Sequence, residues 1–304
     1  MNAIVAVADV PAAKPAQPMR KSMNVLTITV LVENTAGKNG VLAEHGLAYL
    51  IETGGEKVLF DTGQGAVLEN NIQKLNIDLS DVSSIVLSHG HYDHTGGLHI
   101  ALPMIQSPQV YAHPAATDSK FSANPDGGSH PVGMPEADRL ALQQADWIRV
   151  EAPTKLPCGL RLTGPVPRVT DFEDTGGAFY LDAECTVPDE LPDDQSAFLE
   201  TEEGTVVILG CAHSGVINTL QYIQTLTNNR PIHTVIGGMH LIHADKTRMD
   251  RTVEELCAMN IQQLVPCHCT GLPAIVRMWN EFPGKCRPCL VGTVIESSNE
   301  EQEA

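Results

Sequence analysis

The chain has 304 residues, enough for one large α/β domain or two smaller ones. Its 37 acidic side chains outnumber 19 basic ones, and the formal net charge of −18 repels a phosphate backbone, so we expect no nucleic-acid partner. The longest uncharged stretch, 204–229, is interrupted by polar residues and is not expected to span a membrane.

Residues 1–22 are rich in alanine and proline, and their positive charges follow the apolar residues, which is the wrong order for a secretory signal. We expect a disordered extension there and a single domain over 23–304. The eight cysteines show no disulfide framework, which favours a reducing, cytoplasmic location. Cys286 and Cys289 form a lone C-x-x-C whose role stays open between packing and a metal or redox function.

Short β-branched apolar runs predict strands at 26–32, 47–51, 57–60, 85–87, 110–112, 148–150, 206–209, 234–236, 264–265 and 290–295. Amphipathic segments predict helices over 67–75, 136–145, 216–226, 247–259 and 272–281, the fourth of them capped by Asp245. This mixture predicts an α/β fold with sheets between helices. The turn-rich segments 121–135 and 171–194 are expected to be surface insertions that shape a substrate site.

Histidines follow several of the predicted strands. The pattern of strand, histidine and small residues occurs at 85–96, 206–215, 235–240 and 264–271. Ligands collect at the carboxyl ends of strands in α/β sheets, so these segments predict one shared crevice.

The densest group of polar residues is the six-residue string 89–94. Residues two apart on an extended segment point the same way, so His89 and His91 can share one ion while Asp93 and His94 turn toward a second. Imidazole and carboxylate groups are ligands of zinc, manganese and iron. We therefore predict two divalent metal ions, with zinc as the first choice and manganese or iron as alternatives.

This string resembles the metal-binding motif of the metallo-β-lactamase superfamily, and 60–63 resembles the family's first motif. The resemblance runs from about residue 23 to about residue 296 and implies an αββα sandwich of two mixed sheets flanked by helices, with the active site at one edge. It further implies one metal position held by His89, His91 and a later histidine, and another held by Asp93, His94 and His268. Asp61 would orient one of these ligands.

The segment after the predicted strand 206–209 departs from the family pattern. Cys211 stands where members usually have a bridging aspartate or sometimes a cysteine, and His213 follows two residues later. We predict that His213 completes the first metal position. Cys211 is either a bridging ligand or a small buried residue. Asp194, near the place of a missing upstream histidine, is either a ligand or part of an acidic turn.

Further strings resemble a branch of the superfamily related to an archaeal synthase of methanopterin assembly; they are 44–47, 163–168, 193–195, 210–218, 237–241 and 267–271. Among other polar residues, His240 is predicted to contact the substrate or transition state. Arg168 is either an anion clamp or a surface ion pair, and His113 is either a pocket wall or structural. The remaining histidines interpreted as structural are His45, His99, His130, His233 and His243.

The leading hypothesis is a hydrolase that acts on an ester, lactone, amide or phosphoester through water activated by two metals, with Asp93 and His240 as catalytic residues. The alternative is a metal-dependent transferase similar to the synthase of this branch. An iron-dependent oxidoreductase and a non-catalytic metal-binding module are weaker hypotheses. All the enzymatic hypotheses imply a small-molecule substrate, and the oligomeric state is left open.

Overall fold

The computed structural model describes residues 26–297 and contains two facing mixed β-sheets. The seven-stranded sheet has the order β16-β1-β2-β3-β4-β5-β8, with bounds β1 Leu26–Val32, β2 Ala48–Thr53, β3 Glu56–Phe60, β4 Val82–Val86, β5 Gln109–Ala112, β8 Asp146–Arg149 and β16 Val294–Ser297. The six-stranded sheet has the order β15-β14-β13-β12-β10-β9, with bounds β9 Thr154–Lys155, β10 Arg161–Leu162, β12 Ala197–Glu200, β13 Thr205–Ile208, β14 Ile232–Gly238 and β15 Gln263–Cys267.

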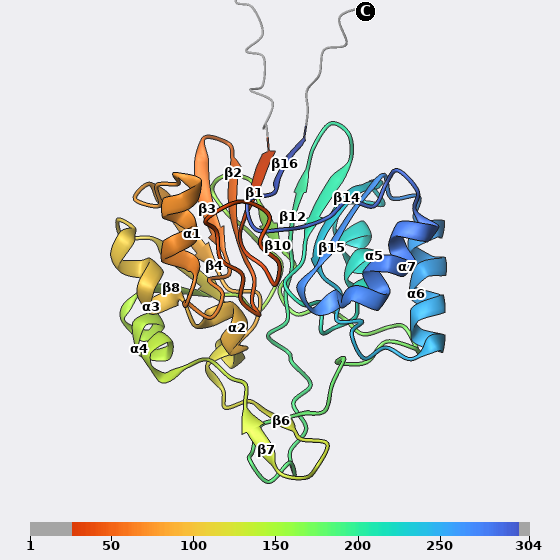
Figure 1. Ribbon diagram of the computed structural model, residues 1–304, viewed down its shortest axis with the longest axis horizontal. Helices are drawn as coiled ribbons and strands as arrows, with labels where there is room; N and C mark the ends of the chain where they lie inside the picture. Colours follow the sequence, from red (N-terminus) through yellow and green to blue (C-terminus); the bar gives the residue numbers. More distant parts are fainter. Residues whose placement is uncertain (1–25, 298–304) are drawn as a thin grey trace, which may run out of the picture.

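Helices cover the outer face of each sheet (Figure 1). On the first sheet they are α1 Leu68–Leu75, α3 Leu98–Ala101 and α4 Glu136–Gln144; on the second they are α5 Val216–Leu226, α6 Lys246–Ala258 and α7 Leu272–Glu281. The short α2 Tyr92–Thr95 lies instead at the lower edge of the sandwich (Figure 1). One apolar cluster fills the space between the sheets, and two more lie beneath the helix layers. The predicted αββα sandwich is therefore confirmed. Because both sheets share an interior, we propose one domain over 23–304.

The structure contains the predicted strands and helices, with bounds that differ by a few residues. The helices over 216–226 and 272–281 have the predicted bounds, and Asp245 caps α6 by accepting a hydrogen bond from the backbone nitrogen of Arg248 at 2.8 Å. The strand expected at 290–295 begins only at Val294, because 290–293 form a turn in which Leu290 N is bonded to Thr293 Oγ1. The extension expected at residues 1–22 lies outside the described residues.

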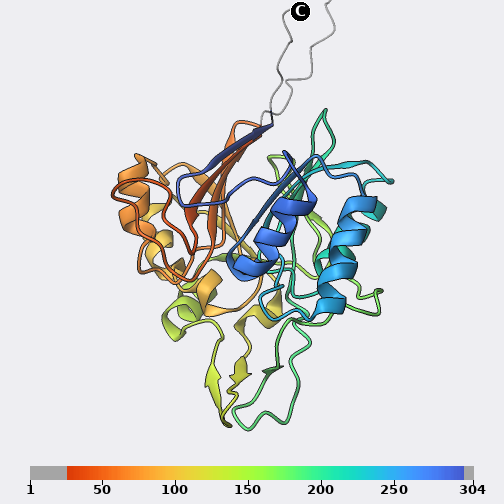
Figure 2. The same cartoon turned by 45° about the vertical axis from the view of Figure 1, so that its right-hand side comes forward.

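The two predicted insertions pair with each other in a small third sheet. Its order is β11-β6-β7, with β6 Phe121–Ala123 and β7 Ser129–Pro131 from the first insertion and β11 Phe179–Tyr180 from the second. This sheet projects below the sandwich in both views (Figures 1 and 2). The segments predicted only as loops thus form a structured wall beside one edge of the sandwich.

Within residues 26–297, none of the helices combines the length and apolar character needed to cross a membrane.

Candidate metal centre

The four histidine-bearing segments follow β4, β13, β14 and β15, and their side chains meet in one cavity of about 290 Å³. Tight turns bring them there, since Ala212, His240 and His268 all adopt left-handed backbone conformations, with φ between 43° and 51°. Such conformations cost free energy in residues other than glycine and are maintained by the surrounding packing. In the 89–94 loop, a Cβ on Gly90 would lie 2.2 Å from the carbonyl oxygen of Ala116, so only glycine fits.

His89, His91 and His213 form the first donor cluster, and all three are buried. The Nε2 of His89 lies 3.0 Å from the Nδ1 of His91. His213 donates through Nδ1 to the carbonyl oxygen of Thr175 at 2.7 Å, which leaves its buried Nε2 with a lone pair and no hydrogen-bond partner among the described residues. Burial is the largest influence on all three rings; it lowers the pKa of His91 to about 3 and holds those of the other two well below the usual value.

His94, His268, Asp93 and Cys211 form the second cluster. His94 Nε2 lies 3.2 Å from His268 Nε2, 3.1 Å from Cys211 Sγ and 3.7 Å from Asp93 Oδ2. The other ring nitrogen of His94 faces Asp61 Oδ2 at 2.8 Å, and that of His268 faces the side-chain oxygen of Asn34 at 2.9 Å. Both outer partners are acceptors, because the carboxylate cannot donate and the Asn34 oxygen also accepts from Gly46 N. When both rings are neutral, as metal ligands must be, their inner nitrogens present lone pairs toward each other.

This arrangement of donor atoms fits a cation. Two imidazole lone pairs and a carboxylate oxygen within 3.7 Å of one another repel unless a positive charge lies between them. Ligands about 2.0–2.3 Å from a tetrahedral ion lie about 3.3–3.8 Å apart, close to the spacings in both clusters. The donor types, imidazole, carboxylate and thiol, are those of a zinc or other transition-metal site.

The charges within the second cluster shift its pKa values in opposite directions. Burial alone would lower the pKa of His94, but the carboxylates of Asp93 and Asp61 raise it to about 9. Burial would raise the pKa of Asp93, but the charge of His94 and the neighbouring side chains of His268 and His45 hold it well below its usual value. Burial also raises the pKa of the Cys211 thiol well above its usual value. The cluster thus favours an ionised Asp93 and a compensating positive charge beside it.

Several residues predicted from the sequence lie elsewhere. Arg168 donates to the carbonyl oxygens of His213 (3.0 Å) and Glu190 (2.9 Å), so its guanidinium supports the His213 turn. It lines a neighbouring cavity and not that of the metal centre, and its role as an anion clamp stays a prediction. His113 accepts from the Ala115 backbone nitrogen at 3.1 Å and caps the short helix that follows, which gives it a structural role outside the metal-centre cavity.

Asp194 is buried instead of lying in a solvated turn. One of its oxygens accepts from the backbone nitrogen of Ser214 at 2.8 Å, and it belongs to neither donor cluster. Asp61, in contrast, lies where the resemblance implied, with its carboxylate bonded to His94 and to the hydroxyl and backbone nitrogen of Ser88. His240 lies in the cavity wall, its ring centroid 4.2 Å from that of His213.

Sequence reasoning missed three histidines of the cavity. His45, His130 and His243 all line it, and His45 Nε2 lies 3.2 Å from Asp93 Oδ2. The string 44–47, already singled out as similar to one branch of the family, was the available signal for His45. Phe179 of β11 also lines the cavity, with its ring centroid 4.9 Å from that of His91. No sequence pattern marked it, because its position depends on the pairing of the two insertions.

The fold and the donor set together define a metal-site protein of the metallo-β-lactamase class. The chain belongs to the metallo-β-lactamase superfamily, whose family model matches residues 42–225. It is 28% identical over 286 residues to a 7,8-dihydropterin-6-methyl-4-(β-D-ribofuranosyl)-aminobenzene-5′-phosphate synthase of Methanocaldococcus jannaschii, covering 89% of this chain and 96% of the relative. An uncharacterized protein of the same organism, MJ0448, is 33% identical over 254 residues, covering 83% and 93%.

A solved structure shares the fold over nearly the whole chain. It is Tm1679, described as a metal-dependent hydrolase of the β-lactamase superfamily, with a TM-score of 0.77 and 32% identity, covering 90% of this chain and all of that one. A diphosphatase of the PhnP family, at 16% identity and a TM-score of 0.50, shares the fold.

Proposed function

We propose that the protein is a metal-dependent hydrolase of an ester, lactone, amide or phosphoester. The observation that carries this proposal is the convergence of two buried clusters of imidazole, carboxylate and thiol donors on one cavity. His89, His91 and His213 would hold one divalent ion, and Asp93, His94 and His268 the other, with Cys211 as a further ligand beside His94. Zinc is the first choice, with manganese or iron as alternatives. The hydrolase description of Tm1679 supports the proposal.

When bound, the metal ions would lower the pKa of water and stabilise negative charge on the substrate. Asp93 would then orient the activated water beside the ions, and His45 Nε2, 3.2 Å from Asp93 Oδ2 on a side chain that is 52% exposed, connects this carboxylate to solvent.

His240 would act on the substrate as a hydrogen-bond donor. Burial, followed by the nearby His213, holds its pKa well below the usual value, so its ring is neutral at physiological pH. A neutral imidazole steadies a developing oxyanion through its N–H better than it protonates a leaving group. His240 would thus make the transition-state contact predicted from the sequence, as a hydrogen-bond donor.

A metal-dependent transferase is the second candidate. The alignment with the aminobenzene-phosphate synthase covers nearly all of both chains and favours it. A transferase requires room for two substrates, which the cavities beside the 171–179 segment could supply. The two reactions differ in a simple way, since a hydrolase turns over with water alone and a transferase needs an acceptor. The cytoplasmic location and the absence of a nucleic-acid partner stay predictions from composition.

Metal analysis of the purified protein, beside His91→Ala and His233→Ala variants, tests the proposal. We expect about two zinc, manganese or iron ions per chain, fewer in His91→Ala, and an unchanged content in His233→Ala, because His233 packs beside Thr234 on β14 outside the cavity. Turnover of ester, lactone and phosphoester panels would then be measured with and without nucleophilic acceptors. A protein with no bound metal, or a His91→Ala variant with full metal content, contradicts the assignment.

A further inference from the structure

A second cavity, of about 710 Å³, adjoins the metal-centre cavity. Its walls are the first turn of α6 and the segment 171–178. His243 lines both cavities, and Gly176 in the wall lies directly against the His240 ring, where a Cβ would be 2.1 Å from Nδ1. A substrate that places its reacting bond at the metal centre can therefore extend into this second cavity.

Arg248 is the unusual residue of this wall. Its side chain is only 6% exposed, and its Nε and Nη2 have no hydrogen-bond partner among residues 26–297. Its one ion pair is between Nη1 and Asp174, whose side chain is 74% exposed. Burying a guanidinium with unpaired N–H groups costs free energy that one solvent-exposed carboxylate offsets only in part.

The acidic residues around Arg248 are already engaged. Asp171 pairs with Arg251 at 2.6 Å, and Asp245 caps the helix by accepting from Arg248 N. Among residues 26–297, Asp174 is the one acidic residue bonded to the Arg248 guanidinium, and the same oxygen also accepts from Gly176 N at 2.7 Å.

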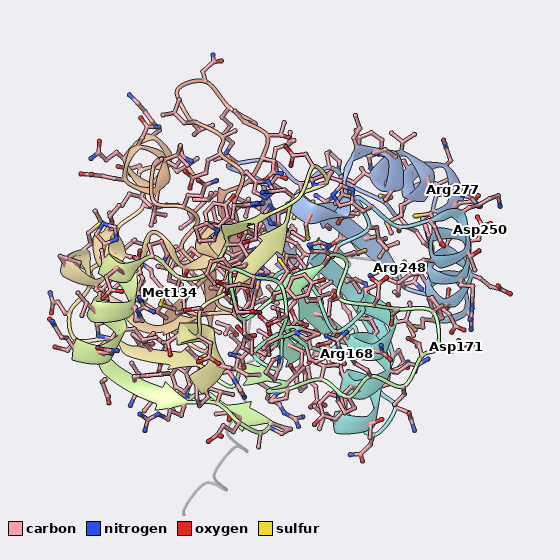
Figure 3. The ribbon with its side chains drawn as sticks, turned by 90° about the horizontal axis from the view of Figure 1, so that it is seen from below. Met134, Arg168, Asp171, Arg248, Asp250 and Arg277 are labelled. Atoms are coloured by element: carbon pink, nitrogen blue, oxygen red, sulfur yellow. The ribbon has the colours of Figure 1, made fainter. Side chains whose placement is uncertain are left out.

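The start of α6 adds positive potential to the same place. The helix has 13 residues, and its first backbone N–H groups carry the positive end of its dipole toward the cavity wall. Neither lysine nor arginine contributes to the lining of the metal-centre cavity in the described part of the chain, whereas Arg248 and Arg251 line the second cavity. In Figure 3, Arg248 lies nearer the middle of the molecule than Arg277 and Asp250, which lie at its outer edge.

We propose that the second cavity binds a phosphate group of the substrate, remote from the reacting bond, and that this phosphate replaces Asp174 on Arg248. The statement that the phosphate belongs to the substrate rests on the proposed function, whereas phosphate binding itself does not. A guanidinium pairs with phosphate oxygens through two parallel hydrogen bonds, and the helix start supplies further donors. When the cavity holds no ligand, the Asp174 carboxylate takes the position on Arg248 that the phosphate would occupy.

Calorimetric titration of the full-length protein with inorganic phosphate at constant ionic strength tests this inference. Arg248→Gln should weaken binding by about tenfold or more, whereas Arg277→Gln, an exposed arginine of α7, should leave it unchanged. Asp174→Asn should strengthen binding by about threefold or more, because it removes the competing carboxylate. That variant alters an exposed side chain, so it decides the question even if Arg248→Gln fails to fold.

A chelator-treated His91→Ala protein separates this site from the metals. Phosphate bound at Arg248 persists in that protein, and phosphate bound by metal ions disappears. Binding that is lost in chelated His91→Ala but retained in Arg248→Gln overturns the proposal, as does a wild-type protein without saturable binding. Failure of the hydrolase assay alone leaves these titrations unaffected, so the two proposals fail separately.

Discussion

The contact between Asp61 and His94 gives the sharpest test of the proposed metal centre. Asp61 is fully buried, and its Oδ2 accepts from His94 Nδ1 at 2.8 Å, which turns the Nε2 lone pair toward the second cluster. Asp61 also has a left-handed backbone with φ of 58°, a conformation that asparagine adopts readily. Asp61→Asn therefore preserves the backbone and the size of the side chain while removing the negative charge behind the histidine.

We expect Asp61→Asn to weaken the binding of one metal ion by about 10–100-fold, which is the usual cost of losing a partner behind a metal-ligating histidine. This range corresponds to about 1.4–2.8 kcal/mol of binding free energy. The other ion should be affected less, because Asp61 reaches the first cluster only through the Ser88 hydroxyl, which lies 2.9 Å from His89 Nδ1. Competition with a zinc chelator at fixed pH measures both affinities.

The chain offers a matched control. Asp138 is also fully buried and contacts a histidine ring, that of His99, at 2.8 Å, but this pair lies between α3 and α4 outside the metal cavity. Asp138→Asn should lower the free energy of unfolding without changing metal affinity. If Asp61→Asn binds both ions within twofold of the wild type, the role of Asp61 is refuted.

Two further predictions concern the cavity. Gly176→Ala should lower catalytic activity at least several-fold, because the new Cβ would collide with His240. Gly55→Ala is the control, since Gly55 has a similar φ of 81° and its added Cβ would have no atom within 4 Å. It should cost only about 1 kcal/mol of stability and no activity. The metal-depleted protein should lose stability on acidification from about pH 6.5 to about pH 3. The folded-state pKa values of His268 (about 4) and His91 (about 3) lie below the ordinary value, so the unfolded chain binds more protons in this window. Urea denaturation across that range measures the effect, and a flat profile would contradict it.

The apolar runs predicted an α/β fold, and the resemblance carried by 60–63 and 89–94 implied the sandwich and the residues of the candidate site. The strands of the two central sheets are apolar runs bounded by turn residues, and the string 89–94 carries four donors in six residues. The pairing of β6 with β11 depends instead on residues more than 50 positions apart, and each strand has only two or three residues. No sequence pattern therefore predicted that Phe179 and the carbonyl of Thr175 contact the first donor cluster.

Arg168 and Cys211 show a different limit. The residue type predicted what the Arg168 guanidinium can bind but not its partners, which in the structure include the backbone carbonyls of His213 and Glu190. For Cys211 both interpretations survive, because the residue is buried and also lies 3.1 Å from His94 Nε2. The residue type limits what a side chain can bind, and the fold determines which of those partners lie close enough to contact it.

A buried ion cluster beneath the 89–94 loop carries the last prediction. Lys120 Nζ contacts Asp189 at 2.9 Å and Asp193 at 3.0 Å, and all three side chains are at most 1% exposed. The other oxygen of Asp193 accepts from Gly90 N at 2.7 Å, so this cluster positions the turn between His89 and His91. Lys120 thereby connects the start of β6 to the first donor cluster.

Lys120→Met should destabilise the protein by about 3–5 kcal/mol, because it leaves two buried carboxylates without their cation. Burial already raises the pKa of Asp193 despite Lys120, so without the lysine its carboxyl group protonates at still higher pH. The stability difference between wild type and variant should therefore be small near pH 4 and grow toward pH 7. Lys57→Met removes an exposed ion pair with Asp81 and should cost no more than about 1 kcal/mol. A Lys120→Met variant whose stability loss matches that of Lys57→Met, or does not change with pH, would show that the cluster does not support the loop.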